Sequence, residues 1–238
     1  MRRGNVVLAL AILVAAAICV RLGIWQLSRY QQKQRLNAER AARLAEPPVL
    51  WDGTASMSDL SGRRIALHGR YDSTRHVLLA YREHDGTTGV EVVTPLVPNG
   101  GRPVLVNRGW LPADDGVSAR PQDFSEPGEV EVVGVAEPFV HGRFGVRRLE
   151  SDSVTLFSTR GLDADSVAAR LGPVAPFVVR QTPGEGVPSR PRRSAPPEFD
   201  TGMHLAYAIQ WFVIGAVVLG GGWVLLRLRS RSSARSAA

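Results

Sequence analysis

The chain has 238 residues, a formal net charge of +7 at pH 7 and a single cysteine, Cys19. One cysteine excludes an internal disulfide, a zinc site built on several thiolates and a copper carrier built on a cysteine pair. The basic residues are spread through loops and tails and do not alternate with aromatic residues along one stripe, so the charge favours membrane topology and anionic lipid over nucleic acid.

An uncharged run near the N-terminus predicts a first membrane-spanning helix. The run Val6–Val20 lies between an arginine pair and a further arginine, and the helix would reach Trp25 as an interfacial anchor. A cleaved signal peptide is the alternative, because a basic start, an apolar stretch and Ala15–Ala17 fit that pattern. The apolar run continues past these alanines, which favours an uncleaved span over residues 6–27 after a cytoplasmic N-terminus, residues 1–5.

A second uncharged run, Leu205–Leu226, is 22 residues long. At about 1.5 Å per residue, such a helix is long enough for a hydrocarbon core of about 30 Å. We therefore expect a span over residues 203–226 and a basic cytoplasmic tail over residues 227–238. Arginines crowd the end of this span and acidic residues precede it, which predicts both termini in the cytoplasm. Basic residues after the first span argue for the opposite orientation, and the stronger second span decides the prediction.

Between the spans, residues 28–181 predict an extracytoplasmic domain rich in strands. Residues 28–46 are rich in helix formers and extend the first span as a helix until Pro47 and Pro48 end it. Beyond them, five runs show a hydrophobic period of two and are separated by turn signals. The runs are Arg64–Tyr71, His76–Tyr81, Val90–Leu96, Val104–Asn107 and Glu129–Val135. Their spacing predicts an antiparallel, barrel-like sheet in an α+β membrane protein.

One late helix and a tether complete the expected architecture. Asp163 as N-cap and the pair Gly172-Pro173 as a stop delimit the helix, whose apolar residues share one face. A further strand is expected at Phe177–Arg180. Residues 182–202 contain five prolines and several arginines, and predict an extended tether that need not fold.

Sequence patterns of catalysis are missing. The chain has no G-x-S-x-G nucleophile elbow, no glycine-rich phosphate loop with its lysine, and no histidine pair at metal-ligand spacing. His68, His76 and His84 follow the spacing of hairpins, and we expect them to be exposed strand or loop residues. The chain is therefore not expected to be an enzyme.

The densest local motif of the middle domain is Asn107–Pro112, with the sequence Asn-Arg-Gly-Trp-Leu-Pro. It ends a strand with a turn and places the cation of Arg108 beside the aromatic ring of Trp110. Two interpretations stay open. Both residues bind a partner, or Trp110 covers the end of the sheet while Arg108 stacks or pairs nearby.

Polar and aromatic residues gather where the two spans are expected to meet the membrane surface. They are Trp25, Gln26 and Arg29 on the first span, and His204, Tyr207 and Trp211 on one face of the second. An aromatic belt alone would explain the aromatic residues. His204 needs a polar partner, and a helix N-terminus disfavours its protonation. A neutral imidazole is a competent ligand of haem iron, and Arg29 suits a haem propionate. From the residues alone, both interpretations stay open.

Several motifs also occur in a characteristic order. They are Gly23–Gln26 with Arg29, Gly69–Asp72, Gly89–Pro95, Val104–Pro112 and His204–Phe212. Together with the layout of two spans, this order resembles the Surfeit-locus family of cytochrome c oxidase assembly proteins, in a bacterial, actinobacterial-like form. The resemblance covers nearly the whole chain. The stretch Gly184–Pro197 departs from the family pattern and is interpreted as an embellishment of this lineage.

The resemblance implies an assembly factor in the bacterial plasma membrane whose partners are membrane lipid and the catalytic subunit of the oxidase. Bacterial relatives are associated with binding haem a and handing it to that subunit. The family's proposed axial ligand matches His204, and its tryptophan–glutamine pair matches Trp25 and Gln26. We expect Tyr207, Trp211 and Arg29 to complete the haem a site. The alternative is a cofactor-free scaffold that holds subunit one through its sheet and the Arg108–Trp110 edge.

Overall fold

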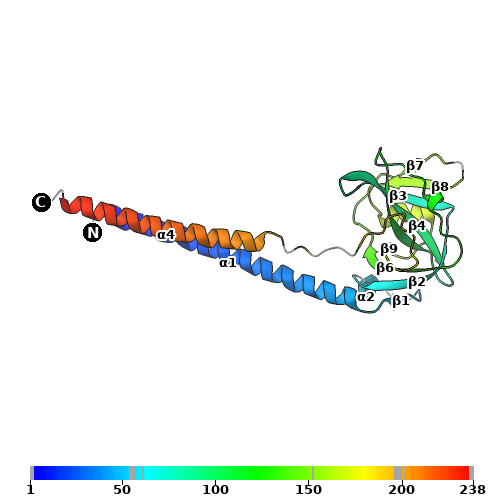
Figure 1. Ribbon diagram of the computed structural model, residues 1–238, viewed down its shortest axis with the longest axis horizontal. Helices are drawn as coiled ribbons and strands as arrows, with labels where there is room; N and C mark the ends of the chain where they lie inside the picture. Colours follow the sequence, from blue (N-terminus) through cyan, green and yellow to red (C-terminus); the bar gives the residue numbers. More distant parts are fainter. Residues whose placement is uncertain are drawn as a thin grey trace. The chain divides into compact units, whose positions relative to one another are not determined.

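The computed structural model describes residues 3–53, 57–60, 62–151, 153–195, 200 and 202–235. The chain divides into two compact units (Figure 1). A helical unit comprises Met1–Glu39 and Phe199–Ala238, and a sheet domain comprises Arg40–Glu198.

Two long helices account for most of the helical unit, and the last residues of the first helix, from Arg40 on, are counted with the sheet domain. Helix α1 covers Arg3–Ala45 and helix α4 covers His204–Arg235. Both contain segments that are long and apolar enough to cross a membrane. Helix α1 continues through the predicted extension and ends at Ala45, just before the Pro47-Pro48 pair.

Small residues line the contact between α1 and α4. Cys19 faces Gly215, Gly23 faces the ring of Phe212, and Gly222 faces Ile12. A Cβ atom added to Gly215 would lie only 3.2 Å from the Cβ of Cys19. As the residue numbers increase along α1, the numbers of the contacting residues on α4 decrease, so the two helices are antiparallel. Helices in lipid associate through such close packing, because lipid gives no hydrophobic drive between them.

The sheet domain is built on one mixed sheet. Among the described residues, nine strands pair in the order β1-β2-β6-β9-β5-β4-β3-β8-β7. The strands are β1 (Val49–Leu50), β2 (Arg64–Tyr71), β3 (Arg75–His84), β4 (Thr87–Pro98), β5 (Val104–Pro112), β6 (Val130–Pro138), β7 (Arg147–Leu149), β8 (Thr155–Thr159) and β9 (Phe177–Gln181). The short helices are α2 (Met57–Leu60), η1 (Pro121–Phe124) and α3 (Ala164–Leu171).

The α+β class and the predicted strands are confirmed, but the purely antiparallel sheet is wrong. The pairings β1–β2, β3–β8 and β5–β9 are parallel. Strands β8 and β9 both pair with strands formed much earlier in the chain, and α3 lies between them. A hydrophobic period of two indicates only that a segment is extended. It does not indicate which distant strand the segment pairs with, or whether the pairing is parallel.

An additional pairing between β2 and β4 connects strands that are apart in the strand order. It completes a circuit of pairings through β2, β6, β9, β5 and β4. Gly69 lies at this junction, opposite Pro98, and a Cβ atom added to Gly69 would lie 2.8 Å from the Pro98 Cα. All five strands contribute to one buried apolar cluster, which includes Ile65, Leu96, Val106, Val132 and Phe177. The circuit therefore encloses the main core of the domain.

Helix α3 forms where it was predicted. The carboxylate of Asp163 accepts a hydrogen bond from the backbone N–H of Ser166 at 2.9 Å, which caps the helix N-terminus. Gly172, with φ of +78°, ends the helix.

The first part of the predicted tether folds onto the sheet domain, so that part of the prediction is wrong. The backbone of Arg192 pairs with that of Trp110 through two hydrogen bonds, of 2.9 and 2.8 Å. Pro191 and Arg193 are buried. Arg193 also has a largely buried acidic partner, Glu126. Residues 196–199 and 201 of the predicted tether lie outside the described residues.

His76 is fully buried, contrary to the expectation that it is exposed. Its Nδ1 lies 2.9 Å from Thr94 Oγ1 and its Nε2 lies 3.0 Å from the carbonyl oxygen of Ser73. Two hydrogen bonds allow a neutral imidazole to be buried in the sheet. Burial, with a smaller contribution from the positive charge of Arg108, lowers the pKa of His76 to about 4. His68 is exposed as expected, and His84 is half-buried.

The buried His76 predicts a loss of stability in mild acid. Its pKa is about 4 in the folded chain against 6.5 unfolded, so between these values the unfolded chain binds a proton that the folded chain does not. Stability should therefore fall as the pH falls through this window, by up to roughly 3 kcal/mol. Urea unfolding of the full chain in detergent at several pH values measures this loss. His76→Gln should lose less stability than the wild type, and the exposed His68→Gln should match it. Equal losses in the wild type and His76→Gln would contradict the prediction.

The contact between α1 and α4 predicts the reactivity of the only cysteine. Gly215→Leu should force the helices apart at Cys19 and raise the rate of thiol alkylation several-fold in detergent, because Cys19 is only 7% exposed. Gly220→Leu is the matched control on α4, since a Cβ atom added there meets nothing within 4 Å. Equal alkylation rates in the two variants would show that this packing does not hold the helices together.

Candidate functional site

The start of α4 meets α1 through a polar contact. His204 Nδ1 lies 2.7 Å from the side-chain carbonyl oxygen Oε1 of Gln26. A carbonyl oxygen only accepts hydrogen bonds, so Nδ1 of His204 donates and carries the proton. In a neutral imidazole the lone pair is then on Nε2, the nitrogen that remains for a metal. Gln26 thus orients the ring and selects its tautomer.

Gly202 leaves space beside this nitrogen. A Cβ atom added to Gly202 would lie 4.0 Å from His204 Nε2 and 3.4 Å from the ammonium nitrogen of Lys33. The backbone φ of +67° at Gly202 also disfavours other residues. Lys33 therefore adds a cation near His204 that the sequence analysis missed. Its position two helical turns after Gln26 was the available signal.

The other predicted residues lie within seven positions of Gln26 or His204 along the two helices. The guanidinium of Arg29 lies 5.9 Å from the ring centroid of Trp25 and donates to Gln32 Oε1 at 3.0 Å. Trp25 is 50% exposed and Tyr207 is 44% exposed, whereas Trp211 is half-buried. Tyr207 and Trp211 follow His204 on α4 by three and seven positions. The helical unit thus presents aromatic surface and cations next to one oriented histidine.

The donor set does not suit a bare metal ion. Among the described residues, no three side chains of histidine, cysteine, aspartate or glutamate gather closely enough to hold one. A single imidazole suits a metal that brings its own equatorial ligands, as the iron of a macrocycle does.

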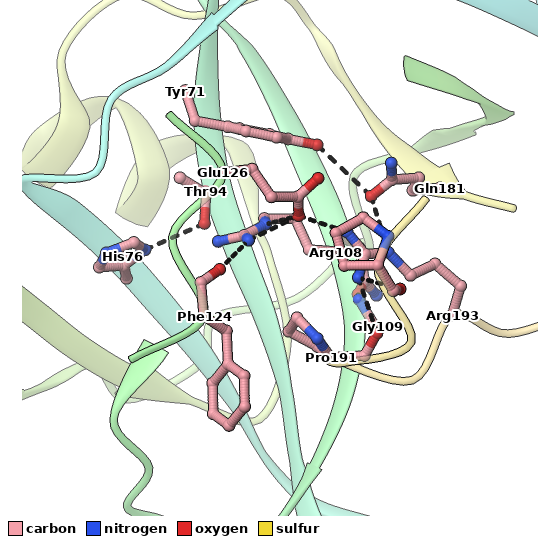
Figure 2. A network of polar contacts seen from close by, with 12 residues as sticks. Tyr71, His76, Thr94, Arg108, Gly109, Phe124, Glu126, Gln181, Pro191 and Arg193 are labelled. Atoms are coloured by element: carbon pink, nitrogen blue, oxygen red, sulfur yellow. Dashed lines mark hydrogen bonds and ion pairs between the residues drawn. The ribbon is translucent and has the colours of Figure 1, made fainter. Parts of the chain in front are cut away.

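A second polar cluster lies inside the sheet domain, and we call Arg108, Glu126 and Arg193 the arginine clasp (Figure 2). Glu126 Oε1 accepts hydrogen bonds from Arg108 Nη2, at 2.6 Å, and from Arg193 Nη2. The two arginine side chains are 1% and 2% exposed, and the glutamate side chain is 11% exposed. Removing a partner from such a buried ion pair leaves an uncompensated charge.

The Asn107–Pro112 motif builds one side of the clasp. Val92 pairs with Gly109 and Val93 with Asn107, so Arg108 is the extra residue of a β-bulge. Gly109 has a φ of +112°, and a side chain there would collide with the backbone that follows Pro191. The Asn107 side chain accepts a hydrogen bond from the Gly109 N–H at 3.0 Å.

Of the two interpretations of this motif, a partner contact or a pairing within the domain, the second fits Arg108. Its buried guanidinium donates hydrogen bonds to Glu126 and to the carbonyl of Phe124, so it is not accessible to a partner protein. Trp110 donates from Nε1 to the carbonyl of Arg82 at 3.2 Å and remains half-buried. A partner role for Trp110 stays a prediction.

A second motif, Gly69–Asp72, meets the clasp through Tyr71. The Arg108 guanidinium lies 4.8 Å from the centre of the Tyr71 ring. Tyr71 Oη donates to Gln181 Oε1 at 3.4 Å, and Arg193 Nε donates to the same oxygen at 3.0 Å. Burial, followed by the negative charge of Glu126, raises the pKa of Tyr71 above its usual range. Figure 2 shows the Tyr71 hydroxyl directed at Gln181, next to the two arginines that bind the Glu126 carboxylate.

Arg193 fastens the segment after β9 to the sheet domain. Its Nη1 donates to the carbonyls of Pro188 and Pro191, at 3.0 and 2.9 Å. Neither Glu126 nor Arg193 was predicted as a site residue. Both lie in proline-rich loops without a periodic pattern, so no local signal could have paired them.

Comparisons with known proteins find the same family along most of the chain, in the helical unit and in the sheet domain. The sequence matches the profile of the SURF1 family over residues 13–216. An uncharacterized SURF1-like protein of Mycobacterium tuberculosis is 28% identical over 249 aligned residues, covering 99% of this chain and 90% of that protein. Surfeit locus protein 1 of Takifugu rubripes is 32% identical over 155 residues, covering 54% of this chain and 63% of that protein. A SURF1-like protein of Dictyostelium discoideum is 36% identical over 103 residues, covering 39% of this chain and 38% of that protein.

The arginine clasp predicts that a single conservative substitution at Glu126 lowers the free energy of unfolding strongly. Glu126→Gln keeps the shape of the side chain but leaves two buried arginines without their carboxylate, which should lower the free energy of unfolding by about 3–5 kcal/mol. Glu129→Gln is the matched control, since Glu129 pairs with Arg70 at 3.6 Å and both side chains are more than half exposed. The control should cost less than about 1 kcal/mol. Urea unfolding followed by tryptophan fluorescence measures both, and equal costs would refute the structural role of the clasp.

Proposed function

Because this chain belongs to the SURF1 family, we propose that it is a membrane-bound assembly factor for cytochrome c oxidase. The membership confirms the resemblance inferred from the sequence motifs. The two apolar helices support a two-pass protein. The arginines after the second span support both termini in the cytoplasm and the sheet domain on the outer side of a bacterial plasma membrane.

The cargo we propose is haem a, with His204 as the axial ligand of its iron. The observation that carries this proposal is the 2.7 Å contact between Gln26 and His204 Nδ1, which leaves Nε2 for the metal. A single oriented imidazole suits a porphyrin-held iron, and the absence of a side chain at Gly202 leaves room beside it.

The surroundings of His204 suit the rest of the molecule. Haem a carries an apolar macrocycle and two carboxylates, the propionates. Arg29 and Lys33 supply positive charge for the propionates. Trp25, Tyr207 and Trp211 supply aromatic surface for the macrocycle. In this function the haem is cargo for the catalytic subunit of the oxidase, and the chain itself performs no covalent chemistry.

The proposal predicts the visible spectrum of the purified protein. The chain is produced in cells that make haem a and is purified in detergent. The wild type should show a Soret band, and His204→Ala should lose or shift it because the iron loses its axial ligand. Gln26→Leu should reduce haem affinity by about 10–100-fold, as expected when a residue that orients a metal ligand is removed. His68→Ala, an exposed histidine of the sheet domain, should leave the spectrum unchanged.

A colourless wild type in the presence of haem a would overturn the cofactor part of the proposal. The cofactor-free scaffold would then stand, and co-purification of the catalytic subunit with the wild type tests it. A Soret band that is the same in His204→Ala and the wild type would place the haem on another residue.

A further inference from the structure

A basic groove lies on the sheet domain, apart from the arginine clasp. It has a volume of about 630 Å³ and is lined by residues of the 118–120 segment, of β7 and of β8. Three of the lining residues are arginines, namely Arg120, Arg147 and Arg148, and one is acidic, Glu150. Three positive charges and one negative charge leave the groove with a net charge of +2.

The three arginines are exposed, and their guanidinium groups make no ion pair or hydrogen bond with the part of the chain that the structure describes. Elsewhere in the domain, arginines such as Arg63, Arg82 and Arg180 are paired with glutamates. Unpaired guanidinium groups that share one groove are suited to carboxylate or phosphate oxygens, which they bind in a bidentate manner.

The groove is lined in part by the last strand of the sheet. Strand β7 is the last strand in the order and pairs only with β8, through Arg147–Ser158, Arg148–Phe157 and Leu149–Leu156. Its other edge has no strand partner within the described residues. Arg147 and Arg148 both belong to this strand and both line the groove, so an extended chain that paired with β7 would meet both cations.

The free edge of β7 favours a protein over a lipid surface. It offers backbone donors and acceptors, which a strand can use and a lipid headgroup cannot use in register.

We propose that the groove at β7 docks an extended acidic segment of a partner protein, which adds a strand to the β7 edge and pairs its carboxylates with Arg120, Arg147 and Arg148. The proposal does not depend on haem binding, since none of these residues belongs to the helical unit.

Fluorescence anisotropy of the full chain in detergent tests the proposal. The probe is a short fluorescein-labelled peptide of glutamates and valines, and the control peptide carries lysines in place of the glutamates. The combined change of Arg120, Arg147 and Arg148 to glutamine should weaken binding of the acidic peptide about tenfold or more. A variant with Arg40, Arg43 and Arg102 changed to glutamine loses the same charge outside the groove and should bind like the wild type.

Two further measurements distinguish strand pairing from simple charge attraction, and a protein partner from a lipid surface. An acidic peptide with methylated backbone nitrogens keeps its charge but cannot donate to β7, so it should bind more weakly. Vesicles of phosphatidylglycerol should bind the groove variant and the control variant equally. The proposal is overturned if acidic and basic peptides bind alike, if the two variants bind the peptide alike, or if methylation has no effect. Loss of vesicle binding in the groove variant alone would overturn it in favour of a lipid site.

Discussion

The sheet domain depends on one carboxylate that serves two buried arginines. Glu126 joins Arg108, on the bulge of β5, to Arg193, in the segment after β9. A buried charge is tolerated only when it is paired and hydrogen-bonded, so the three side chains require one another. The need to bring these three side chains together accounts for features that look unrelated in the sequence. They are the bulge at Arg108, the left-handed backbone of Gly109 and the proline-rich segment that packs on the domain. Two residues of the stretch interpreted as an embellishment of this lineage, Pro191 and Arg193, are buried in the domain.

The motifs that identify the family have different physical roles. Gly69 allows β2 and β4 to approach, and Tyr71 packs on Arg108, so this motif closes the strand circuit and covers the clasp. The Asn107–Pro112 motif builds the bulge. These residues maintain the fold. The motifs at the two spans differ from them, because the histidine and the glutamine that they contain meet in the helical unit at exposed or half-buried positions.

Features with a local cause could be predicted from the sequence, and features with distant partners could not. The strand β2, the helix α3 with its Asp163 cap and the two apolar helices follow from period, propensity and capping. The parallel pairings of β8 and β9 join segments that lie far apart in the chain, and nothing in either segment records its partner's direction. The family resemblance and the expected membrane depth assigned Gln26 and His204 to one site, but their hydrogen bond was not predicted. Lys33 was missed although it follows Gln26 by two helical turns, and Arg193 was missed because nothing local pairs it with Glu126.

The position of β9 also constrains the order in which the domain can fold. This strand lies between β6 and β5, so the circuit cannot close until Gln181 has left the ribosome, and the clasp needs Arg193 as well. Contacts between segments so distant in sequence form slowly, because the loop must be closed before they stabilise it. The early strands would therefore wait with open edges while α1 is already available for membrane insertion. The last strand and the last arginine that the closed sheet needs are thus synthesised only shortly before α4, which begins at His204.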